Sequence, residues 1–280
     1  MSFPRFLSLM KGELYFPNLS TSARVNDPLE GTHLVDPKDL MYALNRQSGK
    51  DQPDPTIIAT IEGAAPGWLR QQMDEKTSPQ YRTNYIGNCY YWYTADRRAI
   101  SCWCASELES AAMWRGFGES GVAVTIRLKN LQRCLDPKKD FTISAVHYID
   151  RSGAKINSAN LEKYWQLTLR PYLVKGLEFE HEKEIRVVTR CLPDSGGVLA
   201  SVDSIAGYLE SVVVSPYVDH SSAFTLARHI DNLLENSPNQ KCARKTQFST
   251  INGTRVEFSA IIAHVNAMRD EYIKSDGLPI

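Results

Sequence analysis

Short apolar runs with strand character are mixed irregularly with helically spaced segments along the whole chain. The strand-like runs are 13–16, 99–105, 121–126, 142–149, 185–188 and 211–215. The helical segments are 37–47, 68–76, 107–117, 158–175, 221–235 and 256–273. Because no strict strand–helix–strand rhythm links them, the order favours an α+β fold over a doubly wound parallel sheet. We expect a mixed, mostly antiparallel sheet flanked by helices.

The chain has 280 residues, 42% of them hydrophobic, which is enough to bury a sizeable core. No Gly/Ser linker, low-complexity tract or block of like charge divides it, so we expect a single compact domain over 1–280. Proline and glycine concentrate in the stretch after residue 48, and we therefore predict a surface excursion over 48–80. Residues 217–280 are predicted to form a helical extension packed on the core.

The charges balance, with 32 basic and 32 acidic residues. Proteins that grip duplex nucleic acid usually show a basic excess, so this balance favours other partners, although a small local site for RNA stays open. No apolar stretch approaches the roughly twenty residues that cross a bilayer, and the first residues lack the layout of a signal peptide. We expect a soluble cytoplasmic protein with no membrane partner.

Six cysteines are scattered along the chain, and none forms a Cys-x-x-Cys pair. Cys102 and Cys104 are the closest two, and they flank Trp103 in an apolar, strand-like run. A zinc site needs two further ligands at metal spacing, which the sequence does not offer. We therefore expect reduced, buried thiols and no bound metal.

The stretch from Glu182 to Arg186 is the best candidate for chemistry. If it is extended, Glu182, Glu184 and Arg186 share one face of a strand. Such a row is costly to bury unless the groups pair or bind something, so a solvated strand face bridged by Arg186 is one interpretation. In the other, Glu184 stabilises an oxocarbenium-like transition state as the nicotinamide–ribose bond of NAD breaks. Glu182 would then orient the acceptor, and Arg186 would keep both acids ionised.

Several motifs occur along the chain in a fixed order: Arg5–Leu9, Gly12–Phe16, Asn26–Gly31, Ser101–Cys104, Glu109–Trp114, Gly121–Val124, Val146–Asp150, Phe179–Arg186 and Val212–Pro216. With these motifs the chain resembles, over nearly its whole length, the bacterial and phage family known as domain of unknown function 2971. That family includes abortive-infection proteins of the AbiGi type. The resemblance implies a role in phage defence or in a toxin–antitoxin system.

The family's layout is similar to that of ADP-ribosyltransferases, which carry an early Arg or His, a middle Ser or Tyr and a late Glu-x-Glu. The matching positions are Arg5, then Ser106 or Ser101, then Glu182 with Glu184 as catalytic residues. The resemblance implies an ADP-ribosyltransferase-like core that uses NAD as a substrate. A nucleic acid or a protein would be the acceptor, and a cognate antitoxin would be a partner.

Four further residues are assigned to the NAD site through the resemblance: Asn26, Asp27, Trp114 and Arg186. We expect Arg5 and Glu184 to approach within one cleft, with the turn at Asn26 and Asp27 on its rim. Structural interpretations stay open for two of these features. The Asn-Asp-Pro sequence is also a turn signal, and Trp114 lies at the spacing of a helix core.

Two other functions are consistent with the sequence. One is a non-catalytic sensor or partner module of a defence or toxin–antitoxin system, in which the glutamates have no catalytic role. The other is a metal-dependent nuclease with ligands drawn from Asp27, Glu30, Glu182 and Glu184. The surroundings of the two late glutamates in the fold distinguish these alternatives.

Overall fold

The computed structural model describes residues 1–20, 37–49, 54–71, 79–106, 108–135, 140–150, 169–193, 195–202, 205–236 and 246–251. The chain divides into two compact units, each built from segments that are distant in sequence. Unit 1 comprises Met1–Leu14, Ser106–Leu135 and Ser201–Ile280, and unit 2 comprises Tyr15–Ala105 and Asp136–Ala200. The helix predicted over 256–273 and most of the one over 158–175 lie outside the described residues.

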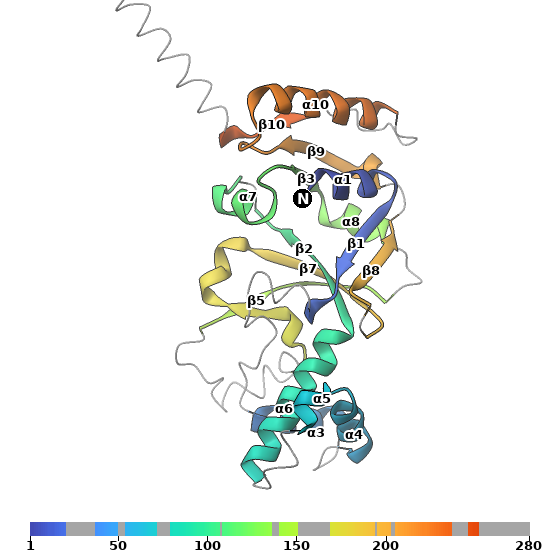
Figure 1. Cartoon of the computed structure of the whole chain (residues 1–280), viewed down its shortest axis with the longest axis vertical. Helices are drawn as coiled ribbons and strands as arrows, with labels where there is room; N and C mark the ends of the chain where they lie inside the picture. Colours follow the sequence, from blue (N-terminus) through green and yellow to red (C-terminus); the bar gives the residue numbers. More distant parts are fainter. Residues whose placement is uncertain are drawn as a thin grey trace, which may run out of the picture. The chain divides into compact units, whose positions relative to one another are not determined.

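Unit 1 contains a three-stranded sheet of order β10-β9-β3. Strand β3 (Val122–Ile126) runs antiparallel to β9 (Leu209–Val214), and β9 runs parallel to the short β10 (Gln247–Phe248). Helix α10 (His220–Glu235) lies along β9 and β10 in Figure 1. It buries side chains at helical spacing, namely Ala223, Ala227 and Ile230. This arrangement confirms the predicted strands near 121–126 and 211–215 and the helix near 221–235.

Unit 1 also contains α1 (Phe3–Met10), α7 (Ala111–Phe117), α8 (Leu128–Cys134) and the 3-10 helix η3 (Ile205–Tyr208). Both α1 and α8 pack against η3. Helix α1 begins with a proline in its first turn, where the missing N–H leaves no hydrogen bond unmade. It presents Phe6 and Leu9 to the interior of the unit.

Helix α7 starts four residues later than the sequence pattern predicts for 107–117. Its N-cap is Ser110, whose hydroxyl accepts the backbone N–H of Met113 at 3.4 Å. The spacing of Ser106 and Glu109 matches a capping box, which predicts Ser106 as the cap, but Ser106 instead accepts the N–H of Leu108. Two serines four residues apart compete for the same role, and the second one caps the helix.

The larger sheet of unit 2 has the order β2-β7-β4 and is antiparallel throughout. Its strands are β2 (Arg98–Cys104), β7 (Glu184–Arg190) and β4 (Thr142–Ala145). The strand predicted over 142–149 is interrupted at Val146, whose N–H bonds to the carbonyl of Glu184. The chain then continues as β5 (His147–Ile149), which pairs in parallel with β6 (Val174–Gly176).

Two 3-10 helices, η1 (Pro171–Leu173) and η2 (Leu177–Glu182), flank β6. The prediction of one helix over 158–175 is therefore wrong for its last residues. Pro171 supplies the physical reason, because it lacks the N–H that a continuing α-helix needs. Strands β1 (Glu13–Pro17) and β8 (Gly197–Ser201) pair separately, and two of the four boundaries between the units fall within them.

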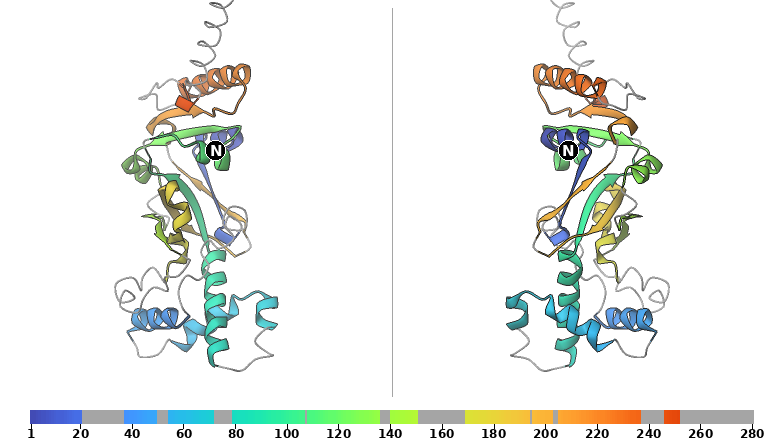
Figure 2. Two further views of the ribbon diagram at one scale, coloured as in Figure 1. Left: turned by 90° about the vertical axis from the view of Figure 1, so that its left-hand side faces the viewer. Right: turned by 90° about the vertical axis from the view of Figure 1, so that its right-hand side faces the viewer.

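A helical layer completes unit 2: α3 (Pro37–Ser48), α4 (Pro55–Gly63), α5 (Gly67–Gln71) and α6 (Pro79–Asp96). Figure 2 shows α3, α4 and α5 grouped around α6. Their shared core consists of Leu40, Leu44, Ile61, Ala65, Leu69, Tyr85, Ile86, Cys89 and Tyr90. Residues 48–80, expected to form a surface excursion, thus include two helices with buried side chains.

The described residues form an α+β fold, as the sequence predicts. Its strands are distributed among several small, mostly antiparallel sheets, and no larger sheet unites them. Within the described part of the chain, no helix combines the length and apolar character required to cross a membrane.

Candidate functional site

The chain turns at Lys183, between η2 and β7. Lys183 has φ 43° and ψ 51°, and no other described residue besides glycine has a positive φ. This left-handed conformation costs a residue with a side chain about 1–2 kcal/mol. Glu182 therefore ends a 3-10 helix while Glu184 begins a strand. Glu184 and Arg186 share a face of β7, as expected, but Glu182 is not part of that strand.

Four charged side chains of unit 2 form what we call the buried ion cluster: Lys175, Glu182, Glu184 and Arg186. The ammonium nitrogen of Lys175 lies 2.5 Å from Oε2 of Glu182 and 3.6 Å from Oε2 of Glu184. Arg186 donates two hydrogen bonds to Glu184, from Nε to Oε1 at 2.8 Å and from Nη2 to Oε2 at 3.0 Å. Two cations and two carboxylates thus balance each other.

The cluster is almost completely removed from solvent. Exposure is 3% for Lys175, 7% for Glu182, 5% for Glu184 and 0% for Arg186. The interpretation of these residues as a solvated strand face is therefore wrong. Desolvating a charge is costly, and it is tolerated here because every member has an opposite charge within contact distance.

The carboxyl group of Glu184 stays ionised despite its burial. Desolvation by itself would raise its pKa, but the charge and hydrogen bonds of Arg186, the Cys102 thiol and Lys175 together hold the pKa below its usual range. The predicted effect of Arg186 on Glu184 is thus supported by geometry. For Glu182 the neutralising partner is Lys175, which the sequence pattern did not identify.

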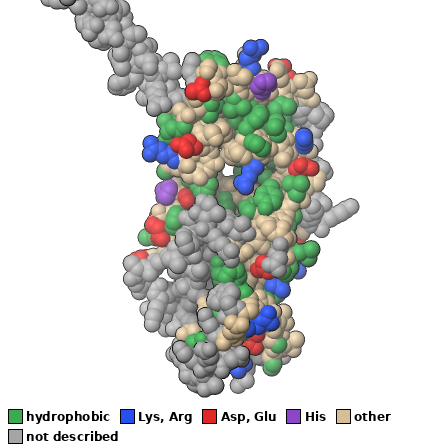
Figure 3. Space-filling view, in the orientation of Figure 1, with side chains coloured by type: hydrophobic (Ala, Val, Ile, Leu, Met, Phe, Trp, Pro, Cys, Tyr) green, Lys and Arg blue, Asp and Glu red, His purple; other side chains and the backbone are tan. Residues whose placement is uncertain are grey.

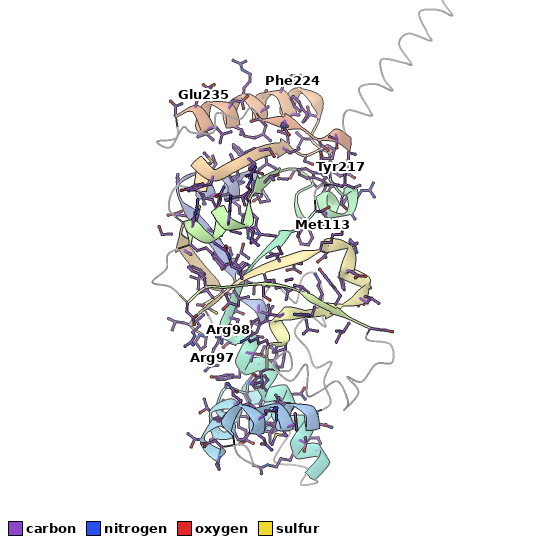
Figure 4. The ribbon with its side chains drawn as sticks, turned by 180° about the vertical axis from the view of Figure 1, so that it is seen from behind. Arg97, Arg98, Met113, Tyr217, Phe224 and Glu235 are labelled. Carbon is purple, nitrogen blue, oxygen red and sulfur yellow. The ribbon has the colours of Figure 1, made fainter. Side chains whose placement is uncertain are left out.

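Two tyrosines hydrogen-bond to residues of the cluster. The carbonyl of Tyr172 accepts a hydrogen bond from Nη1 of Arg186 at 2.6 Å, and the hydroxyl of Tyr148 accepts the N–H of Glu184 at 2.8 Å. Arg98, labelled in Figure 4 where β2 begins, lies 5.6 Å from the centroid of the Tyr172 ring. These contacts fix the orientation of the charged groups before any ligand arrives.

Cys102 and Cys104 border the same face of the sheet. Cys102 is paired with Arg186 and Cys104 with Glu184 in the β2–β7 register. Both cysteines are exposed, which corrects the expectation that they are buried. The run around them is apolar in sequence, but β2 alternates between half-buried and exposed residues over its last four positions.

Ser101, one of the two candidates for the middle serine of a transferase, lies on the opposite face of this sheet. It pairs with Val187, and its hydroxyl accepts the indole N–H of Trp103 at 3.1 Å. Since side chains alternate along a strand, Ser101 points away from the face that carries Glu184. Ser101 and Glu184 therefore lie on opposite faces of the sheet, although β2 and β7 are paired strands.

The other predicted site residues that the structure describes belong to unit 1. Arg5 is exposed on α1, and Ser106 is exposed in the turn before α7. Trp114 is 6% exposed, so the interpretation as a core residue of α7 fits it better than a stacking surface for a cofactor. Asn26 and Asp27 lie outside the described residues. The cleft expected to unite Arg5 with Glu184 stays a prediction.

Glu109 is the residue in unit 1 that sequence reasoning missed. Its Oε2 accepts the indole N–H of Trp114 at 3.0 Å and the hydroxyl of Ser249. Its Oε1 accepts the backbone N–H of Thr250 at 2.7 Å and the hydroxyl of the same residue at 2.9 Å. Glu109 thereby links α7 to the segment after β10. Its sequence context signalled only a capping box, because the partners lie 140 and 141 residues away.

The geometry does not favour a nuclease centre in the described residues. Within them, no group of three His, Cys, Asp or Glu side chains is arranged to hold a metal ion. Glu182 and Glu184 are already neutralised by Lys175 and Arg186. The remaining proposed ligands, Asp27 and Glu30, lie outside the described part of the chain.

On the face shown in Figure 3, the surface of the described residues shows no concentration of one charge that would indicate a class of ligand. Figure 3 shows acidic and basic side chains interspersed on one face, in keeping with the balanced charge of the sequence. Two grooves of about 320 and 400 Å³ flank α10 in unit 1 and share His229 in their lining. Neither groove is lined by a predicted site residue.

Comparisons with known proteins found no matching family model, no similar curated protein and no similar solved structure. The family resemblance read from the motifs accordingly stays a prediction.

Proposed function

We propose that this chain is a non-catalytic sensor or partner module of a bacterial defence or toxin–antitoxin system. The absence of catalysis is inferred from the buried ion cluster, in which Glu182 is paired with Lys175 and Glu184 with Arg186. The assignment to a defence system rests on the motif resemblance alone. In this proposal the two glutamates stabilise unit 2 and take no part in a reaction.

A carboxylate that stabilises an oxocarbenium-like transition state must reach the ribose at hydrogen-bond distance. Both oxygens of Glu184 already accept hydrogen bonds from Arg186, and Oε2 also lies beside Lys175. The Cys102 thiol donates to the same carboxyl group. A substrate would have to replace part of this network and desolvate its partners again, which disfavours catalysis at this carboxylate.

An NAD-dependent ADP-ribosyltransferase is the second candidate, and one observation favours it. Glu184 is ionised and held rigidly by Arg186, which is the state that electrostatic stabilisation of a developing cation requires. For this candidate, NAD would be the substrate and the acceptor a nucleic acid or a protein.

Measuring NAD consumption together with stability separates the two candidates. Glu184→Gln should lower the unfolding free energy by about 3–5 kcal/mol, since it leaves Arg186 buried without its counter-charge. Glu180→Gln is the matched control, because Glu180 is exposed on η2 and its replacement should change stability by less than about 0.5 kcal/mol. Wild-type protein should consume no NAD.

The transferase would be established instead by NAD consumption that Glu180→Gln retains and Glu184→Gln loses while still folded, as judged by circular dichroism below its melting temperature. Toxicity on expression gives a second readout of the same comparison. If the wild-type protein consumes no NAD and Glu184→Gln is as stable as the wild type, the structural basis of our proposal is removed.

A further inference from the structure

Cys102 and Cys104 are placed as a pair by the geometry of β2. They are two residues apart on a regular strand, so their side chains project from the same face. Trp103 between them projects from the other face, where its indole N–H bonds to Ser101. Both cysteines are exposed, so reagents in solution reach them.

The spacing of the pair suits a bridging ion better than a direct disulfide. Two residues along a strand span about 6.7 Å between Cα atoms. That separation is at the upper limit of disulfides, about 6.8 Å, so a direct bond would be strained. An ion held at about 2.3 Å from each sulfur lets the two sulfurs remain well over 4 Å apart.

We propose that Cys102 and Cys104 form a two-thiolate binding site for a soft monovalent cation, Cu(I). Thiolates select soft ions such as Cu(I) and Zn²⁺ over hard ones. Zn²⁺ favours four ligands, but within the described residues no group of three His, Cys, Asp or Glu side chains is arranged to hold a metal ion, and both oxygens of the neighbouring Glu184 are bound by Arg186. Cu(I), in contrast, binds two thiolates stably in a linear arrangement.

The binding step balances without any redox change. Two thiols and one Cu(I) give a bis-thiolate complex of charge −1 and release two protons. Because binding releases protons, the affinity for Cu(I) should increase as the pH rises. The loss of the Cys102 S–H also removes its hydrogen bond to Glu184, which ties the site to the buried ion cluster. Arg186 lies across from Cys102 and Glu184 lies across from Cys104, and because these two charges are paired with each other they add no net charge beside the complex.

This site is independent of the proposed function, because exposed paired thiols can bind an ion in either a sensor or an enzyme. The test is a competition for Cu(I) between the full-length protein and the chelator bicinchoninate, with ascorbate as a reductant that contains no thiol. Wild-type protein should take one more equivalent of Cu(I) from bicinchoninate than Cys102→Ser or Cys104→Ser does. Thiolate-to-copper absorption in the near ultraviolet should accompany binding.

A matched control keeps the number of thiols and changes only their direction. The double variant Ser101→Cys with Cys102→Ser moves one thiol to the opposite face of β2 while Cys104 stays in place. Its affinity for Cu(I) should fall at least tenfold, with the melting temperature measured to confirm folding. A control variant that competes as well as wild type would overturn the proposal, as would a wild-type protein that withdraws no Cu(I) beyond the single variants.

Discussion

Glu184 in unit 2 and Glu109 in unit 1 are two ionised carboxylates that the fold stabilises in different ways. Glu184 is 5% exposed and is matched by two cations, Arg186 and Lys175. Glu109 is only half-buried, and it is matched by the neutral donors of Trp114, Ser249 and Thr250. Desolvation opposes ionisation in both, yet both pKa values lie below the usual range.

The difference shows how burial determines the kind of partner that a carboxylate requires. Where some solvent remains, several N–H and O–H dipoles are enough to keep a carboxylate charged. Where solvent is excluded, an opposite charge is needed, and its own burial must then be compensated as well. Removing a partner should therefore be more damaging in unit 2 than in unit 1.

The largest effect is expected for Arg186→Met. This change leaves Glu184 buried with only the more distant Lys175, and it should lower the unfolding free energy by about 3–5 kcal/mol. Arg190→Met is the matched control on the same strand, because Arg190 is 74% exposed and should lose less than about 1 kcal/mol. Urea unfolding monitored by circular dichroism measures both.

Combining Arg186→Met with Glu184→Gln tests the reason for that effect. If uncompensated charge causes the loss, the double variant should be more stable than Arg186→Met alone. Strictly additive losses in the double variant would show that lost packing, rather than an unpaired charge, dominates.

A smaller effect is expected for Glu109→Gln in unit 1. Gln keeps one acceptor oxygen but places an amide donor against another donor, so about 1–2 kcal/mol should be lost. Glu119→Gln is the control in the same unit, because the Glu119 side chain is exposed. Equal stability of both variants would contradict the hydrogen-bonded role of Glu109.

Acid should remove the contribution of Glu109. Its folded pKa is depressed, so its stabilisation is complete above the unfolded pKa of about 4.5 and is lost as the pH falls through the folded pKa. The stability difference between wild type and Glu109→Gln should therefore shrink below about pH 4.5. Urea unfolding at a series of pH values measures it, and a difference that grows toward acid would refute the assignment.

The sequence predicts local features of this molecule better than its long-range contacts. Period-two alternation located β7 and the shared face of Glu184 and Arg186. It did not reveal that Lys175 neutralises Glu182, because that contact depends on β6 and η2 packing beside the sheet. Nor does composition signal the left-handed turn at Lys183, a position where glycine would be expected.

Burial was the property that sequence reasoning judged least well. One of the two interpretations of the charged row on a strand placed it in solvent, and the apolar run around Cys102 and Cys104 was interpreted as buried. The structure reverses both: the two sets share one face of the sheet, but the charged row lies on the central strand β7 and the cysteines lie on the edge strand β2. In unit 1, the signal for Glu109 was a local capping box, whereas its partners come from the distant end of the chain.

The smallest effect is expected for Asp140→Asn, which breaks the ion pair between Asp140 and Arg190. The two side chains are 63% and 74% exposed, and their charged atoms lie 2.9 Å apart. That distance resembles the 2.8 Å between Arg186 and Glu184 on the same strand, so distance alone would predict similar losses. Water screens the exposed pair, however, and its removal should change the unfolding free energy by less than about 0.5 kcal/mol. Added salt should reduce this difference further, whereas it should leave the loss in Arg186→Met nearly unchanged. A loss above about 2 kcal/mol for Asp140→Asn would show that burial is not what separates the two pairs.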